Sequence, residues 1–215
     1  MRFGVFGTGE VGQALATKLV SLGHEVMLGS RQRGNEKAVA WSQRVGELGR
    51  EGSFADAAQF GDILINATGG QVSLSALQAA GVADLPGMLL IDVSNPLQWT
   101  ESGVGLCVCN TDSVGEQIQR AFPKLRVVKT LCTVNNQVMV NPSVVPGQHT
   151  MFLCGNDAAA KQQMLSILQE FGWPAENCMD LGDITASRAI EMLILLWLKV
   201  YDVVDTLHFN LHVVH

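Results

Sequence analysis

The stretch RFGVFGTGEVG, residues 2–12, decides the fold, because a short apolar run leads directly into a glycine-rich turn. The turn carries the pattern GxGxxG at Gly7, Gly9 and Gly12, and apolar residues at helical spacing follow over residues 11–22. In such a turn the first glycine permits a tight bend, the second lets a pyrophosphate approach the backbone, and the third lets helix and strand pack closely. The helix N-terminus adds free N–H groups and a favourable dipole. The context favours a dinucleotide site over the alternative, a glycine-rich turn without a ligand.

Strand and helix patterns alternate beyond this turn. Strands are expected at residues 25–28, 62–66, 89–93 and 126–131. Helices are expected at residues 53–60, 74–80 and 114–122. Strands that alternate with helices imply a parallel, doubly wound sheet. We therefore expect an α/β protein whose residues 1–142 form a Rossmann domain.

The pattern restarts after Pro142, in the proline- and glycine-containing segment 141–147, which is the best linker candidate. The expected elements are a strand at 150–154, a helix at 158–171, a short strand at 179–181 and a long apolar helix at about 184–207. We expect residues 143–215 to form a smaller C-terminal α/β lobe that ends in this long helix. Charged residues interrupt the helix well short of the ~20 apolar residues of a membrane span.

The composition excludes several classes of partner. The net charge is −6 and 47% of the 215 residues are hydrophobic, which is ample for a core. An acidic chain has no general affinity for nucleic acid or for anionic membranes, since both need a basic surface. The N-terminal residues lack the pattern of a signal peptide, so a cytoplasmic location is expected.

The cysteines and histidines point to no metal site. The five cysteines lack CxxC spacing and are expected to be reduced core thiols. Cys107 and Cys109 would face the same side of a strand, which leaves a redox or metal role as the alternative. His208 and His212 have the i, i+4 spacing of a metal pair, but no acidic third ligand is apparent.

The turn after the second strand selects the nucleotide. In NAD-specific proteins this strand typically ends in an acidic residue that binds the adenosine ribose, whereas here it runs into Gly29-Ser30-Arg31-Gln32-Arg33. A hydroxyl and two guanidinium groups suit a 2′-phosphate, because arginine binds phosphate through a planar, charged fork. The turn therefore predicts NADP(H), the alternative being a solvated basic loop.

Two well-known dehydrogenase mechanisms do not fit. The Tyr-x-x-x-Lys pair of short-chain dehydrogenases is excluded, because the only tyrosine is Tyr201 and Asp205 stands four positions later. Too few residues follow the sheet for the large helical domain of β-hydroxyacid dehydrogenases. Polar residues gather instead at the ends of expected strands, at 66–69, 92–96 and 130–136, where each could equally serve a turn.

Nearly the whole chain resembles the family of NADP oxidoreductases that use the deazaflavin coenzyme F420, in its bacterial branch. The similar motifs are GTGEVG (7–12), GHEV (23–26), GSR (29–31), IDVSNP (91–96), VVKT (127–130), TVN (133–135), NP (141–142), CGND (154–157) and SRAIE (187–191). The resemblance implies a protein, often dimeric, in which hydride passes directly between nicotinamide and deazaflavin. In such a mechanism the protein contributes orientation and desolvation, so no catalytic acid–base pair is expected.

The resemblance also implies where the cofactor lies. Thr8, Ser30, Arg31 and Arg33 would contact the adenosine end and the pyrophosphate, while residues near 66–67 and 133–135 would approach the ribose and nicotinamide. The full set of expected cofactor contacts is Gly7, Thr8, Gly9, Glu10, Val11, Gly12, Ser30, Arg31, Arg33, Asn66, Ala67, Thr68, Ser94, Asn95, Thr133 and Asn135.

The hydride acceptor stays open, because residues 130–135 depart from the pattern of the better-understood deazaflavin enzymes. We expect an oxidoreductase that uses NADPH with coenzyme F420, FMN, FAD or a small carbonyl or quinone compound as second substrate. The alternatives are a non-catalytic NADP(H)-binding redox sensor, and a structural or interaction protein that binds no nucleotide. The apolar C-terminal helix predicts a homodimer, because it carries more apolar surface than one lobe needs to bury.

Overall fold

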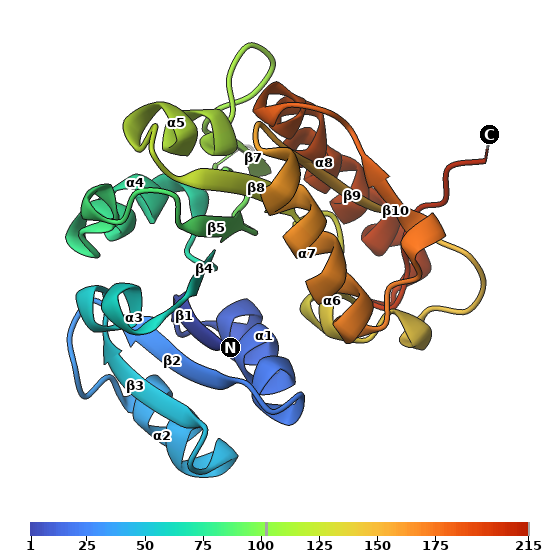
Figure 1. Ribbon diagram of the computed structural model, residues 1–215. Coiled ribbons are helices and arrows are strands. Elements are labelled where there is room, and N and C mark those ends of the chain that lie inside the picture. The colour runs from blue at the N-terminus through green and yellow to red at the C-terminus, as the bar shows by residue number, and fades with distance from the viewer. Residues whose placement is uncertain (102, 215) are drawn as a thin grey trace.

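One eight-stranded sheet organises the chain in the computed structural model, which describes residues 1–101 and 103–214 (Figure 1). The strand order is β10-β9-β8-β5-β4-β1-β2-β3. The strands are β1 (Arg2–Phe6), β2 (Glu25–Ser30), β3 (Gly49–Ser53), β4 (Ile63–Asn66), β5 (Leu89–Asp92), β8 (Arg126–Thr130), β9 (Met151–Gly155) and β10 (Cys178–Asp180). From β3 to β8 the order is that of a doubly wound Rossmann sheet. The expected α/β fold class is confirmed.

The central strands β4 and β5 are buried throughout and mostly apolar, because helices cover both faces of the sheet. Successive side chains of a strand point to opposite faces. In β4, Ile63 and Ile65 therefore enter one core cluster and Leu64 enters another. This is the pattern of a parallel sheet buried on both sides.

The helices lie in two layers (Figure 1). The first core cluster contains residues of α1 (Glu10–Ser21), α2 (Glu36–Val45), α6 (Asn136–Val140) and α7 (Ala158–Phe171). The second contains residues of α3 (Phe54–Phe60), α4 (Gly70–Ala79) and α5 (Val114–Ala121). The long helix α8 (Ser187–Val204) packs against β9 through a third cluster that includes Cys132, Phe152 and Ile190, and it also contacts α5.

The C-terminal part continues the main sheet. β9 pairs with β8 in the antiparallel direction, with Cys154 opposite Lys129, and β10 pairs with β9 in parallel. Residues 143–215 thus share their sheet with residues 1–142, and the division of the chain at this point stays a prediction. The long helix expected at 184–207 is present as a short 3₁₀ turn, Ile184–Ala186, followed by α8.

Some elements were not expected from the sequence. These are α2, β3, α6 and a hairpin of β6 (Leu97–Thr100) and β7 (Gly103–Leu106). The expectation that Cys107 and Cys109 share a strand is wrong, because β7 ends at Leu106. His208 and His212 lie beyond the end of α8, so their spacing does not place them on one helical face.

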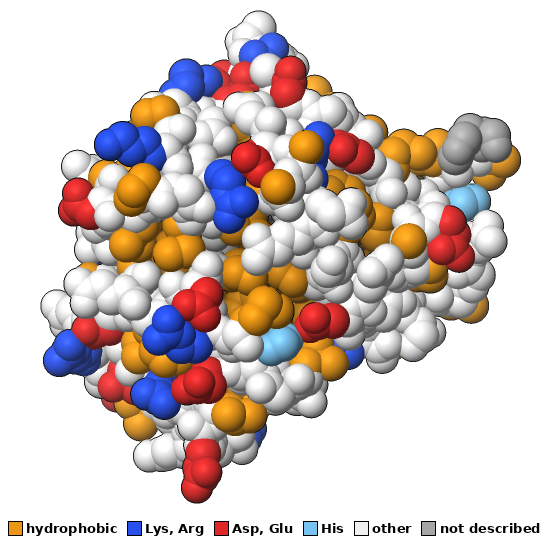
Figure 2. Space-filling model, viewed as in Figure 1, with side chains coloured by type: hydrophobic (Ala, Val, Ile, Leu, Met, Phe, Trp, Pro, Cys, Tyr) orange, Lys and Arg blue, Asp and Glu red, His pale blue; other side chains and the backbone are white. Residues whose placement is uncertain are grey.

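Charge distribution and helix hydropathy were both expected to argue against binding to nucleic acid or membrane. On the face in Figure 2, Lys and Arg side chains are scattered among acidic ones. In the described part of the chain, no helix has both the length and the apolar character needed to cross a membrane.

Candidate functional site

The glycine-rich turn between β1 and α1 has the geometry that its motif predicts. Gly7 has a φ of 117°, and a Cβ there would lie 2.5 Å from the carbonyl oxygen of Ala67. A Cβ on Gly12 would lie 2.0 Å from the Gly7 carbonyl oxygen, so close packing requires this glycine. Among residues 1–101 and 103–214, Gly9 instead faces open space and no side chain caps the start of α1. The turn therefore leaves its backbone N–H groups accessible to an anion.

A cavity of about 600 Å³, here called the first cavity, opens above this turn. It lies at the carboxyl ends of β1, β2 and β4. Its lining residues are Gly7, Thr8, Gly9, Ser30, Arg31, Gln32, Arg33, Gly34, Asn35, Phe54, Ala67, Thr68 and Gly69. It is formed mainly by glycines, hydroxyl groups and the two arginines of the turn after β2.

The two arginines of this turn differ in their partners. The Arg33 guanidinium donates to the Asp56 carboxylate, with its Nε 2.6 Å from Oδ2. This bond, together with those from Ser53, holds the pKa of Asp56 well below its usual range. Within the described residues Arg31 has no ion pair or side-chain hydrogen bond, so its charge is available to an anionic ligand. The Ser30 hydroxyl is engaged locally, donating to the Gln32 carbonyl.

A second cavity, of about 580 Å³, adjoins the first and shares Ala67, Thr68 and Gly69 with it. Its remaining lining residues are Glu10, Val11, Gly70, Gln71, Val72, Val93, Ser94, Asn95, Leu97, Trp99, Cys132, Val134, Asn135, Asn136, Met139, Ile194 and Trp197. Apolar and aromatic side chains dominate this set. The two cavities together follow the carboxyl edge of the sheet, where doubly wound folds bind their ligands.

Three of the expected contact residues, Gly12, Asn66 and Thr133, line neither cavity. Asn66 is fully buried; its Nδ2 donates to Asp92 at 2.8 Å and to Ser73 at 3.0 Å, and its Oδ1 accepts from Thr68. Asn66 therefore fixes the turn after β4 from inside the protein. Thr133 is 5% exposed, and its hydroxyl finds no hydrogen-bond partner within the described residues. Gly12 packs the turn, and the other expected residues line one of the two cavities.

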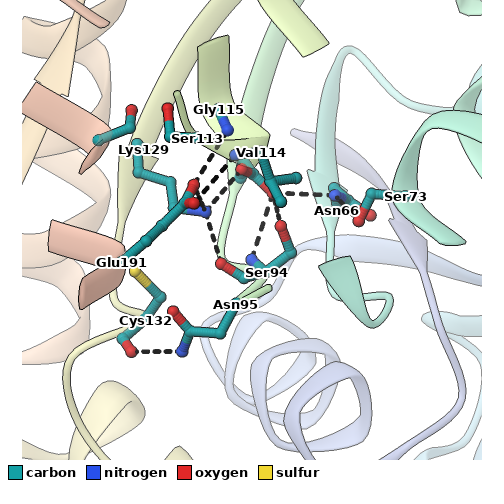
Figure 3. Close-up of polar contacts among 12 residues, drawn as sticks. Asn66, Ser73, Ser94, Asn95, Ser113, Val114, Gly115, Lys129, Cys132 and Glu191 are labelled. Atoms are coloured by element: carbon teal, nitrogen blue, oxygen red, sulfur yellow. Dashed lines mark hydrogen bonds and ion pairs between the residues drawn. The ribbon is translucent and has the colours of Figure 1, made fainter. Parts of the chain in front are cut away.

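A buried charged cluster, which was not expected from the sequence, contacts Ser94 in the lining of the second cavity (Figure 3). Lys129 Nζ lies 2.8 Å from Asp92 Oδ2 and 2.9 Å from Glu191 Oε1, and it donates to the carbonyl oxygen of Ser94. All three charged side chains are at most 2% exposed. Burial alone would lower the pKa of Lys129, but the Asp92 and Glu191 carboxylates outweigh it and raise this pKa well above the usual value. We call these three residues the Asp92–Lys129–Glu191 cluster.

Surrounding backbone and side-chain groups donate hydrogen bonds to the carboxylates of the cluster. Glu191 accepts the backbone N–H groups of Val114 and Gly115, at 2.9 and 3.0 Å, at the start of α5. Asp92 accepts from the Ser94 backbone and hydroxyl as well as from Asn66. The only sequence signal for the cluster is the placement of Lys129 and Glu191 within otherwise apolar runs.

Cys132 lines the second cavity but does not provide a nucleophile. Burial raises the pKa of its thiol to about 12, so the thiol is protonated at neutral pH. Its carbonyl oxygen accepts a 2.7 Å hydrogen bond from Asn95 Nδ2, which joins two walls of the cavity. The lining thus offers shape and apolar surface more than acid–base groups.

Known proteins are similar to this chain in sequence and in fold. The model of the family described as "NADP oxidoreductase coenzyme F420-dependent" matches residues 2–96. The solved structure of a proposed F420-dependent NADP reductase from Arthrobacter sp. FB24 is 39% identical over the whole of both chains, with a TM-score of 0.93.

More distant relatives are also found. Metalloreductase STEAP3 of Rattus norvegicus is 25% identical over 221 residues, which cover 99% of this chain but only 40% of the relative. The chain thus spans about two fifths of the length of that relative. A reductive aminase from Aspergillus terreus, in complex with NADPH and ethyl-5-oxohexanoate, is 17% identical over 95% of this chain and 63% of that chain. Its TM-score of 0.67 shows a common fold.

The family model covers the dinucleotide-binding part of the chain, and the likeness to the Arthrobacter protein covers its full length. The chain therefore belongs to the coenzyme F420-dependent NADP oxidoreductase family, whose members are NADPH-dependent oxidoreductases.

Proposed function

We propose that this protein transfers hydride directly between NADP(H) and a planar redox acceptor, namely a deazaflavin, a flavin or a small carbonyl or quinone compound. The observation that carries the proposal is the pair of adjoining cavities. One is lined by glycines and by Arg31, which has no ion pair in the described part of the chain, and the other by apolar and aromatic side chains. An extended dinucleotide that passes Ala67–Gly69 would reach from the first cavity into the second.

The first cavity fits the adenosine and phosphate end of NADP(H). The open space at Gly9 and the uncapped start of α1 suit the pyrophosphate. Arg31, with Ser30 beside it, suits the 2′-phosphate. Arg33 would contact the same phosphate only by sharing or leaving Asp56.

The second cavity fits the nicotinamide and the acceptor. NADPH supplies a hydride, which leaves NADP⁺ and an anionic reduced acceptor. This anion takes up one proton from solvent to give the neutral reduced product, so no protein acid is required for the hydride step itself. Trp99 offers a flat surface, whereas the Trp197 ring already stacks on Tyr201 and Phe209. Val93, Val134 and Met139 add apolar surface to the lining. The protein thus holds two rings face to face in an apolar space, which is the contribution that direct hydride transfer requires.

The test is NADPH oxidation with a panel of acceptors, namely coenzyme F420, FMN, FAD and menadione, after NADPH and NADH binding have been titrated side by side. The proposal predicts tight NADPH binding, weak NADH binding and oxidation by at least one acceptor. Binding of both NADPH and NADP⁺ without oxidation by any acceptor would indicate a redox sensor. No binding at all would contradict the proposal.

We also propose that the protein forms a homodimer through α8. This helix leaves Leu195, Leu196, Val203 and Val204 exposed, with Val203 at 83%. Leu196 and Val203 stand seven positions apart and so share one face of the helix, and an exposed apolar face marks an interaction site. We expect a dimeric mass by light scattering at micromolar concentration and a shift towards monomer for Leu196→Glu. A monomeric wild type would contradict the proposal.

A further inference from the structure

The Asp92–Lys129–Glu191 cluster carries an unbalanced charge. It combines one ammonium group with two carboxylates, all buried, and the sum is −1. Because Lys129 lies within 2.9 Å of both carboxylates and also donates to the Ser94 carbonyl, it is held in its charged form. The N–H groups at the start of α5 offset part of the Glu191 charge.

The cluster contacts the wall of the second cavity. Ser94 lines that cavity, and its hydroxyl donates to Asp92 at 2.8 Å while its carbonyl accepts from Lys129. Asn95, the next residue, lines the same wall. Figure 3 shows Ser94 beside Lys129, with Asn95 next to it. Ser94 thus both lines the space in which the nicotinamide would lie and contacts the cluster. Charges buried in this way are screened little by salt or solvent.

The two redox states of the nucleotide differ in charge at this place. The nicotinamide ring of NADP⁺ is cationic, and that of NADPH is neutral. A negative charge behind the ring stabilises the cation and leaves the neutral ring almost unaffected. The 2′-phosphate and pyrophosphate are the same in both forms, so their contacts cancel in a comparison.

We propose that the Asp92–Lys129–Glu191 cluster raises the affinity of the site for NADP⁺ relative to NADPH. It would thereby favour hydride transfer from the nucleotide to the acceptor. This inference rests on the proposed function, because it requires the nicotinamide to lie in the second cavity. Lys129 and Asp92 alone form a neutral pair, so we assign the excess negative charge to Glu191 on α8.

The test is the ratio of the dissociation constants of NADP⁺ and NADPH, measured by titration calorimetry. Glu191→Gln removes one negative charge with little change in shape, and we expect the ratio Kd(NADP⁺)/Kd(NADPH) to rise about three- to tenfold. Asp92→Asn should shift the ratio in the same direction although it breaks different contacts, and it serves as second variant if Glu191→Gln does not fold. Mere structural damage would weaken both nucleotides equally and leave the ratio unchanged.

Glu116→Gln is the matched control. Glu116 lies in the first turn of α5 and pairs with Arg188, whose side chain is 37% exposed, so its charge is neutralised and screened. We expect this variant to leave the ratio within about twofold of the wild type. If the wild type binds both nucleotides and neither Glu191→Gln nor Asp92→Asn changes the ratio, this inference is overturned while the proposed function stands. A wild type that binds neither nucleotide overturns the proposed function, and this inference with it.

Discussion

At the scale of single residues, Arg31 and Arg33 take different roles although they lie two positions apart in the same turn. Arg33 is paired with Asp56, which also caps the start of α3, so this arginine already has a structural task. Arg31 lines the first cavity and has no ion pair in the part of the chain that the structure describes. The choice between NADPH and NADH should therefore depend mainly on Arg31.

This difference gives a direct prediction for nucleotide affinity. Arg31→Ala should weaken NADPH binding by about tenfold to hundredfold, the scale of a charge-assisted hydrogen bond, and barely affect NADH. Arg33→Ala is the control and should have the smaller effect. Fluorescence titration of both nucleotides measures the change, and an equal loss for NADPH and NADH would refute the 2′-phosphate role of Arg31.

The sequence predicts which segments form the site better than which of their side chains line the cavities. Asn66 and Thr133 follow strands at the carboxyl edge, as site residues do, yet the structure buries both. Trp99, Met139 and Trp197 were missed, because an apolar residue in a hairpin or helix carries no signal that it lines a cavity. Which side chains meet depends on packing between segments far apart in the sequence.

At the scale of elements, the glycine-rich turn separates a packing role from a binding role. Gly12→Ala places a methyl group 2.0 Å from a backbone oxygen and should destabilise the fold by about 1–3 kcal/mol. Gly9→Ala meets nothing within 4 Å and should fold normally, but its methyl group stands where the pyrophosphate approaches. We expect NADPH affinity to fall about tenfold or more in folded Gly9→Ala. Thermal melts and NADPH titration of both variants check these expectations. A destabilised Gly9→Ala variant with normal NADPH affinity would show that Gly9 serves packing and not binding.

The β6–β7 hairpin places Trp99 at the mouth of the second cavity with 71% of its surface exposed. Such an exposed tryptophan contributes little to the fold, so Trp99→Ala should leave the melting temperature unchanged. We expect the KM for the acceptor to rise about two- to tenfold, the scale of one lost aromatic contact, at constant NADPH affinity. Steady-state kinetics decide it, and an unchanged acceptor KM would remove Trp99 from the site.

The elements that the sequence predicted and those it missed differ in their patterns. β4 and β5 are continuous apolar runs buried on both faces, so they were found within one residue. β3, with the sequence GREGS, lies at the sheet edge and lacks that signal. The turn after β8 depends on Leu131, whose φ of 65° is rare for a residue with a side chain, and no sequence pattern announces it.

At the scale of the whole molecule, Lys129 joins three elements, because it links β8 to Asp92 of β5 and Glu191 of α8. Lys129→Met leaves two buried carboxylates without their cation and should destabilise the protein by about 3–5 kcal/mol. Lys199→Met is the control on α8, where the lysine is exposed and pairs with the exposed Asp202, and should leave stability unchanged. Denaturant unfolding measures both; equal stability of the two variants would show that the cluster does not hold these elements together.

The sequence predicted the strand-and-helix alternation but not how the C-terminal part joins it. The antiparallel pairing of β9 with β8 makes one sheet from segments that a proline-rich stretch separates in the sequence. That pairing brings α8 against α5 and so places Ile194 and Trp197 at the second cavity. A site that spans the chain in this way becomes visible only in three dimensions.

The central claim is that hydride passes directly from NADPH to an acceptor held in the second cavity. The measurement that tests it most directly is single-turnover oxidation of NADPH deuterated at C4 on either face of the ring, with the acceptor that the panel identifies. The account predicts a slower reaction for deuterium on one face only, because a fixed ring presents one face to the acceptor. Oxidation that is insensitive to deuterium on both faces would contradict it.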